Sequence, residues 1–316
     1  MASVALLWKM NIDVKFQQAQ MVAAIVPASI QSLLESSDIH MSRPVQTLEK
    51  IARLIEGGAG RLSVISDFDH TISLAIGEDG TVLPVTHQVL GDALVLPDLN
   101  QKANQEKYAA YSKESTGSDK LAMLEAWWRK AHDGVVARGL TRKEFEERAR
   151  KTDIRLRDSS AVLLHSLSVA GVPTLIFSAG LSDAISFVFH QEIGGIPDGV
   201  HIVGNEMVFD EQGKLVAFKT PLLHPFNKNA SVIDKSSPLH VSISARPHLL
   251  VLGDSMGDLT MEKGLGKERD DTLRIGFLNG QSEKLAQFLQ GYDIVIGTNQ
   301  SIEIPRRIVQ EIIGAK

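Results

Sequence analysis

Residues 62–71 read LSVISDFDHT, an apolar run that ends directly in two carboxylates. Residues 249–258 read LLVLGDSMGD and have the same arrangement. Apolar runs of this length predict buried strands. Two carboxylates then follow each strand: Asp67 and Asp69 after the first, Asp254 and Asp258 after the second. Because strands of an open α/β sheet share one crevice at their carboxyl ends, we expect an acidic cluster that needs a cation.

The rest of the chain alternates helical apolar spacing with short β-branched runs. Helices are predicted at residues 45–55, 158–170, 181–192, 282–290 and 302–313, and further strands at 172–177, 274–278 and 294–296. Asp158 is the expected cap of its helix, and residues 202–218 suggest a hairpin that turns at 210–213. This alternation predicts an α/β fold with a doubly wound, Rossmann-like and mostly parallel sheet.

The stretch between the first strand and residue 152 has a different character. It suggests charged amphipathic helices at residues 100–111, 120–136 and 141–151, with no convincing strand. We interpret residues 74–151 as an inserted helical cap over the carboxyl edge of the sheet. Residues 41–73 and 152–316 then form the α/β core, and residues 1–40 an N-terminal extension, either disordered or used for targeting.

Composition limits the possible functions. The 316 residues include no Cys, which excludes disulfides, thiolate metal sites and cysteine nucleophiles. The net charge of −5 gives no general field for a nucleic acid polymer, and no apolar stretch is long enough to span a membrane. We expect a cytoplasmic monomer, although the acid-poor N-terminus faintly resembles an organelle transit peptide. The ten His residues show no zinc-protease spacing.

Asp67 and Asp69 suit phosphoryl chemistry if both face the crevice. Asp67 would attack phosphorus to form an aspartyl-phosphate, and Asp69 would protonate the leaving oxygen and later activate water. The alternative is a solvated acidic turn, because a DxDxT motif is short enough to arise by chance. The second acidic motif favours the functional interpretation. There Asp254 would ligate magnesium directly, and Asp258 would orient ligands and water.

A phosphate would also need donors and a cation. Ser178, with the amides of Ala179 and Gly180, could cradle the phosphate at the end of the strand at 172–177, or Ser178 could act only as a helix cap. Lys228 is the best candidate for the cation. The alternatives Lys214, Lys219 and Lys235 remain open from composition alone.

Taken together, these motifs resemble the haloacid dehalogenase superfamily of phosphatases. Further stretches resemble the cytosolic 5′-nucleotidase III (pyrimidine 5′-nucleotidase) family: LIEGGAG at 54–60, IFSAGLSD at 176–183, FNK at 226–228, LGDSMGDL at 252–259 and IGFLN at 275–279. The resemblance runs from about Val45 to the C-terminus.

The resemblance implies hydrolysis of nucleoside 5′-monophosphates to nucleoside and phosphate, with Mg²⁺ as cofactor. It implies Asp67 as nucleophile and Asp69 as acid and base. The implied metal ligands are the Asp67 carboxylate, the Asp69 backbone carbonyl and Asp254, supported by Asp258, Thr71 and Ser255. The implied phosphate ligands are Ser178, Ala179 and Lys228, so the resemblance selects Lys228 among the lysines.

The departures from the family pattern lie in the cap. Family members carry a base-recognising Glu shortly after a Lys-Tyr pair, whereas Ser112 stands in that column here and Glu114 follows two residues later. Glu114 could take over substrate binding after a local shift. A family Ser before a His appears here as Ala131. Both changes leave open the preference for a pyrimidine or 7-methylguanosine base.

Three other functions remain open from the sequence. The chain could be a phosphatase for another small phosphomonoester, or a phosphotransferase that passes the phosphoryl group to a nucleoside. It could also be a catalytically silent protein that binds phosphorylated ligands. The pair Trp127-Trp128 could form part of the cap core or a stacking wall for a nucleobase.

Overall fold

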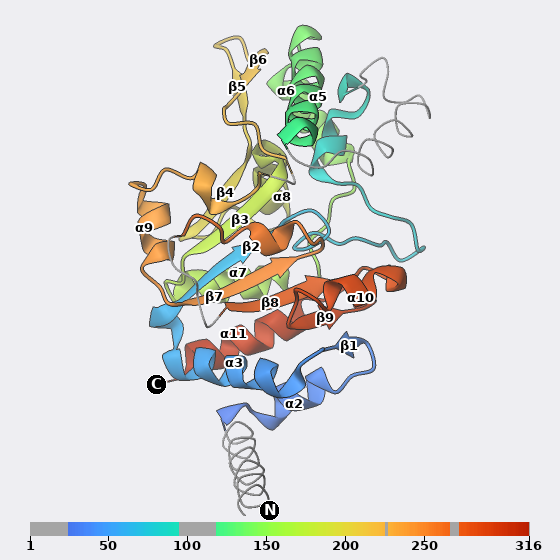
Figure 1. Cartoon of the computed structure of the whole chain (residues 1–316). Helices are drawn as coiled ribbons and strands as arrows, with labels where there is room; N and C mark the ends of the chain where they lie inside the picture. Colours follow the sequence, from blue (N-terminus) through green and yellow to red (C-terminus); the bar gives the residue numbers. More distant parts are fainter. Residues whose placement is uncertain (1–24, 95–117, 225–226, 266–271, 316) are drawn as a thin grey trace, which may run out of the picture.

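A single seven-stranded sheet organises the chain (Figure 1). The computed structural model describes residues 25–94, 118–224, 227–265 and 272–315. The strands are β1 (Ile39–His40), β2 (Leu62–Ser66), β3 (Thr174–Leu181), β4 (Val200–Asn205), β7 (His248–Gly253), β8 (Thr272–Phe277) and β9 (Ile294–Ile296). They lie in the order β1-β9-β8-β7-β2-β3-β4, and all neighbours are parallel except β1 and β9. The predicted doubly wound, mostly parallel α/β fold is confirmed.

The central strands are buried on both faces. Val64 of β2 packs into the cluster formed with helices α3 (Pro44–Gly57), α7 (Ser160–Val169), α8 (Ser182–Ile193) and α11 (Glu303–Gly314). The next residue, Ile65, packs into the cluster on the other face, which includes Ile243 of α9 (Pro238–Ser244). This alternation explains why parallel strands are apolar throughout, since neither face is open to water.

Several predicted elements match the structure closely, whereas others differ for local reasons. β9 has the predicted bounds, and β2 begins with the apolar run at residue 62. The helix predicted at 282–290 is a short 3₁₀ turn (Ser282–Lys284) followed by α10 (Leu285–Phe288). Asp158 does not cap α7: Ser159 occupies the N-cap position in a left-handed conformation without a side-chain cap bond. Residues 202–205 belong to β4, so the hairpin comprises only β5 (Met207–Phe209) and β6 (Leu215–Phe218).

Part of the expected N-terminal extension is packed against the core. Helix α2 (Ala28–Leu34) and β1 lie within residues 25–40. Val26, Ile30 and Leu34 are buried in the main apolar cluster beside α3 and α11. Residues 26–40, which were expected to belong to the extension, are therefore packed with the core in the described part of the chain.

The proposed cap contains α5 (Ser118–Ala137), α6 (Arg142–Lys151) and the 3₁₀ segment η2 (Thr86–Leu94). Thr141 and Glu144 form a reciprocal capping box that starts α6. The β5–β6 hairpin joins this group, because Leu215 N donates to Leu140 O and Arg142 N donates to Gly213 O at 2.8 Å each. Figure 1 shows α5, α6 and the hairpin gathered away from α2, α3 and α11. The helix predicted at 100–111 lies outside the described residues.

No helix in the described parts of the chain combines the length and the apolar character needed to cross a bilayer.

Candidate active site

The loop after β2 places two aspartates on one side and an aromatic ring on the other. Phe68 is fully buried and packs edge-on against Phe189 of α8, with ring centroids 5.8 Å apart. Asp67 is 5% exposed, and Asp69 is partly buried. Asp67 N donates to Leu252 O of β7 at 2.9 Å, so the sheet pairing extends to the backbone of the residue that carries the carboxylate. The apolar side chain between the two acids anchors the loop that presents them.

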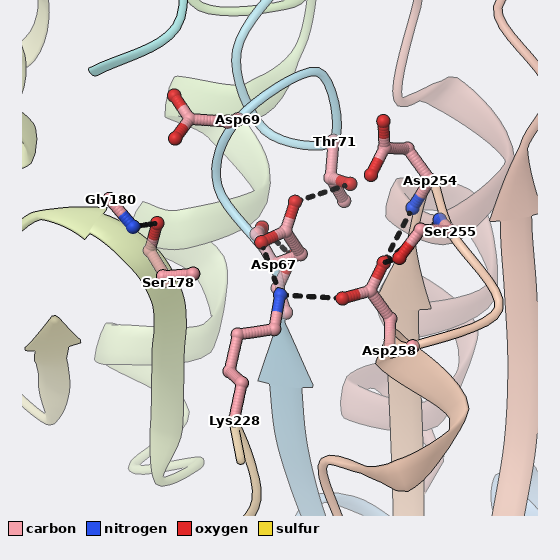
Figure 2. Close-up of polar contacts among 12 residues, drawn as sticks. Asp67, Asp69, Thr71, Ser178, Gly180, Lys228, Asp254, Ser255 and Asp258 are labelled. Atoms are coloured by element: carbon pink, nitrogen blue, oxygen red, sulfur yellow. Dashed lines mark hydrogen bonds and ion pairs between the residues drawn. The ribbon is translucent and has the colours of Figure 1, made fainter. Parts of the chain in front are cut away.

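Lys228 lies between carboxylates from two strand ends (Figure 2). Its Nζ is 2.6 Å from Asp67 Oδ1 and 2.5 Å from Asp258 Oδ1. All three side chains are almost fully buried, so these charge-assisted contacts are shielded from water. The other lysines considered, Lys214, Lys219 and Lys235, are exposed. The structure thus brings Lys228 to the acidic cluster and leaves those three lysines outside it.

Asp258 shapes the loop after β7. Its Oδ2 accepts hydrogen bonds from Asp254 N at 3.1 Å, Ser255 N at 2.9 Å and Ser255 Oγ at 2.8 Å. A Cβ on Gly253 would lie 2.4 Å from the Cβ of Asp258, so only glycine admits this close approach. Asp258 therefore holds both Lys228 and the loop, and this loop in turn presents Asp254.

Asp67, Asp254 and Asp258 form a possible metal site. Each offers a carboxylate oxygen, and these oxygens all lie within 4.8 Å of one another. Thr71 Oγ1 donates to Asp67 Oδ2 at 3.1 Å and so orients that carboxylate. A set of hard oxygen ligands with one lysine to balance them suits a small divalent cation such as Mg²⁺.

The electrostatics reflect the crowding of negative charge. Burial raises the pKa of Asp67 to about 7, with Asp258 and Asp69 adding to the rise and Lys228 opposing it. Burial, together with Asp67 and Asp258, raises the pKa of Asp254 well above its usual value. Burial alone would lower the pKa of Lys228, but Asp67 and Asp258 raise it above its usual range. Lys228 therefore stays charged, while the carboxylates lack sufficient countercharge without a further cation.

Ser178 and its neighbours occupy an irregular part of β3. The pairing of β3 with β4 shifts register between Phe177 and Leu181. Within this bulge, Gly180 N donates to Ser178 Oγ at 2.8 Å. Figure 2 shows Ser178 and Gly180 on one side of Asp67, with Asp254 and Asp258 on the other side. This irregular stretch lies beside the acidic cluster, and bulges are common next to functional sites.

Asn205 ties this bulge to the loop that carries Lys228, and sequence reasoning missed it. Its Nδ2 donates to Ala179 O at 2.7 Å and to Leu223 O at 2.9 Å, and its Oδ1 accepts from Leu223 N at 2.9 Å. The residue is fully buried at the end of β4. No local motif marks it, because its role depends on the pairing of β3 with β4.

Arg157 was also missed. It is 2% exposed and donates to His70 O at 2.6 Å, Thr71 O at 2.8 Å and Asn279 Oδ1 at 2.5 Å. Its guanidinium carbon lies 4.4 Å from the centroid of the Phe277 ring. His70 and Asn279 both have left-handed backbone conformations, so the arginine fork joins two unusual turns. It fastens the loop after β2 to the end of β8.

The predicted base-recognition residues are described only in part. Ser112 and Glu114 lie outside the described residues, whereas Ala131 is buried on α5. The next residue, His132, stacks on Phe218 of β6 with centroids 3.9 Å apart. Trp128 packs on His87 of η2 at 4.7 Å between centroids, which favours the cap-core interpretation for Trp128.

Comparisons with known proteins agree with this geometry. The family model described as pyrimidine 5′-nucleotidase (UMPH-1) matches residues 70–313. The chain belongs to the pyrimidine 5′-nucleotidase family. The resemblance seen in the sequence is thereby confirmed, and the chain is an enzyme, a 5′-nucleotidase of the haloacid dehalogenase type.

Individual relatives match nearly the whole length of the chain. A Caenorhabditis elegans protein described as a cytosolic 5′-nucleotidase 3 is 33% identical, over 91% of this chain and 79% of its own. The 7-methylguanosine phosphate-specific 5′-nucleotidase of Gallus gallus is 32% identical, over 89% of this chain and 98% of its own. The crystal structure of cytosolic 5′-nucleotidase IIIB bound to cytidine matches with a TM-score of 0.76 and 27% identity, over 90% of this chain and 96% of its own.

Proposed function

We propose that this enzyme hydrolyses nucleoside 5′-monophosphates of the pyrimidine or 7-methylguanosine type through an aspartyl-phosphate on Asp67. The observation that carries the proposal is the buried arrangement of Asp67, Lys228 and Asp258 beside Asp254. The names of the relatives support the two base classes. The name cytosolic, given to the structural relative, supports a cytoplasmic location.

Mg²⁺ is the proposed cofactor. The Asp67 carboxylate, the Asp69 backbone carbonyl and Asp254 would hold it, and the clustered carboxylate oxygens fit such an ion. When bound, the ion would offset charge on the phosphate and on the acidic cluster. Thr71, Ser255 and Asp258 would keep the ligands oriented through the hydrogen bonds described above.

The proposed reaction has two steps. Asp67 attacks phosphorus, the bond from phosphorus to the 5′-oxygen breaks, and Asp69 donates its proton to that oxygen. Water then attacks the phosphoryl group on Asp67 and gives a proton to Asp69, which releases phosphate and restores both carboxyl groups. Lys228, Ser178 and the amide of Ala179 bind the phosphoryl oxygens in both steps. Burial of Lys228 strengthens this interaction.

Burial also supports the different roles proposed for Asp67 and Asp69. Burial is the chief cause of a raised pKa at Asp69, and a shift in this direction favours the protonated form that a general acid needs. Asp67 has Lys228 against one oxygen and Thr71 against the other, so its ionised form is favoured once a cation joins the cluster.

The substrate class is tested by phosphate release from CMP, UMP, 7-methyl-GMP, GMP and AMP, with a sugar phosphate and phosphoserine as controls. We expect kcat/KM for CMP, UMP or 7-methyl-GMP to exceed that for both controls at least about a hundredfold, because a base pocket adds binding energy that small esters lack. Glu114→Gln and Ser112→Ala would then show whether either residue contributes to base choice. Equal turnover of all phosphomonoesters would overturn the proposed specificity.

A phosphotransferase activity is the second candidate that the same intermediate allows. An aspartyl-phosphate can react with a nucleoside hydroxyl instead of water. Adding cytidine or another nucleoside as acceptor and measuring new nucleotide against free phosphate separates the two activities.

A further inference from the structure

Thr86 holds both oxygens of the Asp69 carboxylate. Its Oγ1 donates to Asp69 Oδ2 at 2.7 Å, and its backbone N–H donates to Asp69 Oδ1 at 2.8 Å. Thr86 is fully buried at the first position of η2. Two donors on one carboxylate fix the rotation of the side chain, which a single hydrogen bond would leave free. We call these two contacts the Thr86 clasp.

The direction of the hydroxyl bond follows from a third contact. Leu181 N, in the last residue of β3, donates to Thr86 Oγ1 at 3.2 Å. An amide can only donate, so it uses an acceptor site of the hydroxyl, whose proton is then directed to Asp69. The clasp is therefore connected to the backbone of the same strand that carries Ser178.

Gly180 makes room for the clasp. A Cβ at this position would lie 1.8 Å from Thr86 Oγ1, 2.7 Å from Asp69 Oδ2 and 3.0 Å from Ser178 Oγ. Three polar side chains thus converge over the backbone of one glycine, where even a methyl group would collide with two of them. The convergence also shows that the clasp keeps the Asp69 carboxylate next to Ser178.

The clasp comes from the segment that joins core and cap. η2 packs against α5 and α6 of the proposed cap and also against α8 and β3 of the core. Arg148 of α6 also binds η2 to the cap, because its Nη1 donates to Leu90 O at 3.1 Å. A displacement of η2 with the cap would therefore remove both donors from Asp69 at once.

We propose that Thr86 is a positioning residue for proton transfer, which holds Asp69 toward the leaving 5′-oxygen while η2 is docked. This inference rests on the acid and base role of Asp69 in the proposed function. Each carboxylate oxygen retains a second lone pair, so the clasp leaves a site for the transferred proton. Because η2 is shared with the cap, the acid is in place only when the cap segment is seated.

The test compares two leaving groups in Thr86 variants. Thr86→Val removes the hydroxyl at almost constant shape, and Thr86→Ser retains it. kcat/KM reports the steps up to phosphoryl transfer, which need an acid when a nucleoside leaves but not when 4-nitrophenolate leaves. For Thr86→Val we expect kcat/KM to fall about 10- to 100-fold with CMP and less than about threefold with 4-nitrophenyl phosphate. Thr86→Ser should restore most of the activity with CMP.

A double-mutant cycle with Asp69→Asn shows whether Thr86 acts through Asp69. We expect Thr86→Val to cause almost no further loss of CMP hydrolysis in the Asp69→Asn background. Equal losses with both leaving groups, a gain in activity, or an additive loss in the double variant would overturn the proposal. If Asp69→Asn alone kept wild-type activity, the acid role itself would fall, and the clasp proposal with it.

The same set of variants also needs a control for correct folding. Thermal unfolding of each variant separates loss of the Leu181 contact from loss of catalysis. Should Thr86→Val fail to fold, Thr86→Ala removes the same hydroxyl with less bulk and is judged by the same leaving-group comparison.

Discussion

At the scale of single residues, the site contains more acid than base. Asp67, Asp254 and Asp258 share one buried lysine, Lys228. The three aspartates were predicted from their places after apolar runs, and Lys228 was selected by the family resemblance. Thr86 and Arg157 carry no such mark, because their contacts form only when segments far apart in the sequence meet. Sequence reasoning therefore found the groups proposed to touch the phosphate, together with Thr71, Ser255 and Asp258, and missed the more distant supports Thr86 and Arg157.

This excess of negative charge predicts a pH-dependent effect of magnesium on stability. Burial raises the pKa of Asp67 from 3.8 to about 7 in the metal-free fold. The stability linked to its protonated form is present below about pH 4 and is lost as pH rises through about 7. A bound cation should replace that proton. We expect millimolar MgCl₂ to raise the melting temperature more at pH 8 than at pH 5.5.

The size of this rise in melting temperature depends on how fully Mg²⁺ occupies the proposed site. A ligand at a hundredfold excess over its Kd stabilises the fold by about 2.7 kcal/mol. Asp254→Asn, which keeps the shape of a proposed ligand, should reduce the increment at pH 8. An increment that is the same at both pH values, or unchanged in the variant, would contradict the proposed metal site.

At the scale of elements, the strands were the most predictable part. Continuous apolar runs identified β2, β7 and β9, because a parallel strand buried on both faces leaves little room for polar residues. β4 was harder to identify, since its burial pattern includes partly exposed positions and its sequence merges into the hairpin. The two-residue strand β1 pairs antiparallel with β9, and so short an element has no detectable period.

Arg157 joins elements that are far apart in the sequence, and its contacts predict an effect on stability. Replacing it by Met would leave the carbonyl of Thr71 without its side-chain donor, and the carbonyl of His70 would keep only the hydrogen bond from Asn279 Nδ2. We expect the free energy of unfolding to fall by about 2–4 kcal/mol, measured by urea denaturation. Arg157→Lys keeps the charge without the planar fork, so it should recover only part of the loss. A loss below about 0.5 kcal/mol for Met would contradict this role.

The contacts of α5 with η2 and with β6 predict a loss of stability in acid. Burial lowers the pKa of His87 to about 3 and that of His132 to about 4, from 6.5. The stability linked to the two neutral rings is present above about pH 6.5 and is lost as pH falls toward 4, because only the unfolded chain then binds these protons. Each histidine contributes a slope of up to about 1.4 kcal/mol per pH unit.

Chemical denaturation between pH 4.5 and 8 measures this slope. In His132→Asn, the free energy of unfolding should fall less steeply as pH decreases, by the equivalent of roughly one bound proton. Each protein is compared with its own value at pH 8. An unchanged slope in this variant would show that the His132 ring is not the source of the acid sensitivity.

At the scale of the whole molecule, the proposed cap and the core meet at the active site. η2 reaches from Asp69 to α5 and α6, and the β5–β6 hairpin leaves the core half of the chain to pack on α5. The sequence predicted a helical insertion here but did not predict that a hairpin more than fifty residues downstream of α6 would join it. This contact depends on the tertiary pairing of Leu215 with Leu140, which no local pattern encodes.

Opening and closing of the cap should be visible by hydrogen exchange. With Mg²⁺ and vanadate as a phosphate mimic, we expect slower exchange in α5, α6 and η2 than in the free enzyme, because ligand contacts favour the seated cap. Helices α3 and α11, on the opposite side of the molecule, provide the internal control (Figure 1). Equal exchange in the cap with and without the mimic would argue against closure.

The central claim is that Asp67 carries the phosphoryl group, and trapping that group tests it most directly. In Asp69→Asn, 4-nitrophenyl phosphate should still phosphorylate the enzyme, because its leaving group needs no acid, whereas hydrolysis should slow for lack of a base. We predict a burst of nitrophenolate equal to the enzyme present, and mass spectrometry after borohydride reduction should find homoserine at position 67. The same treatment of Asp67→Asn should give neither signal. Continued turnover with position 67 unmodified, or a phosphoryl group on another residue, would contradict the account.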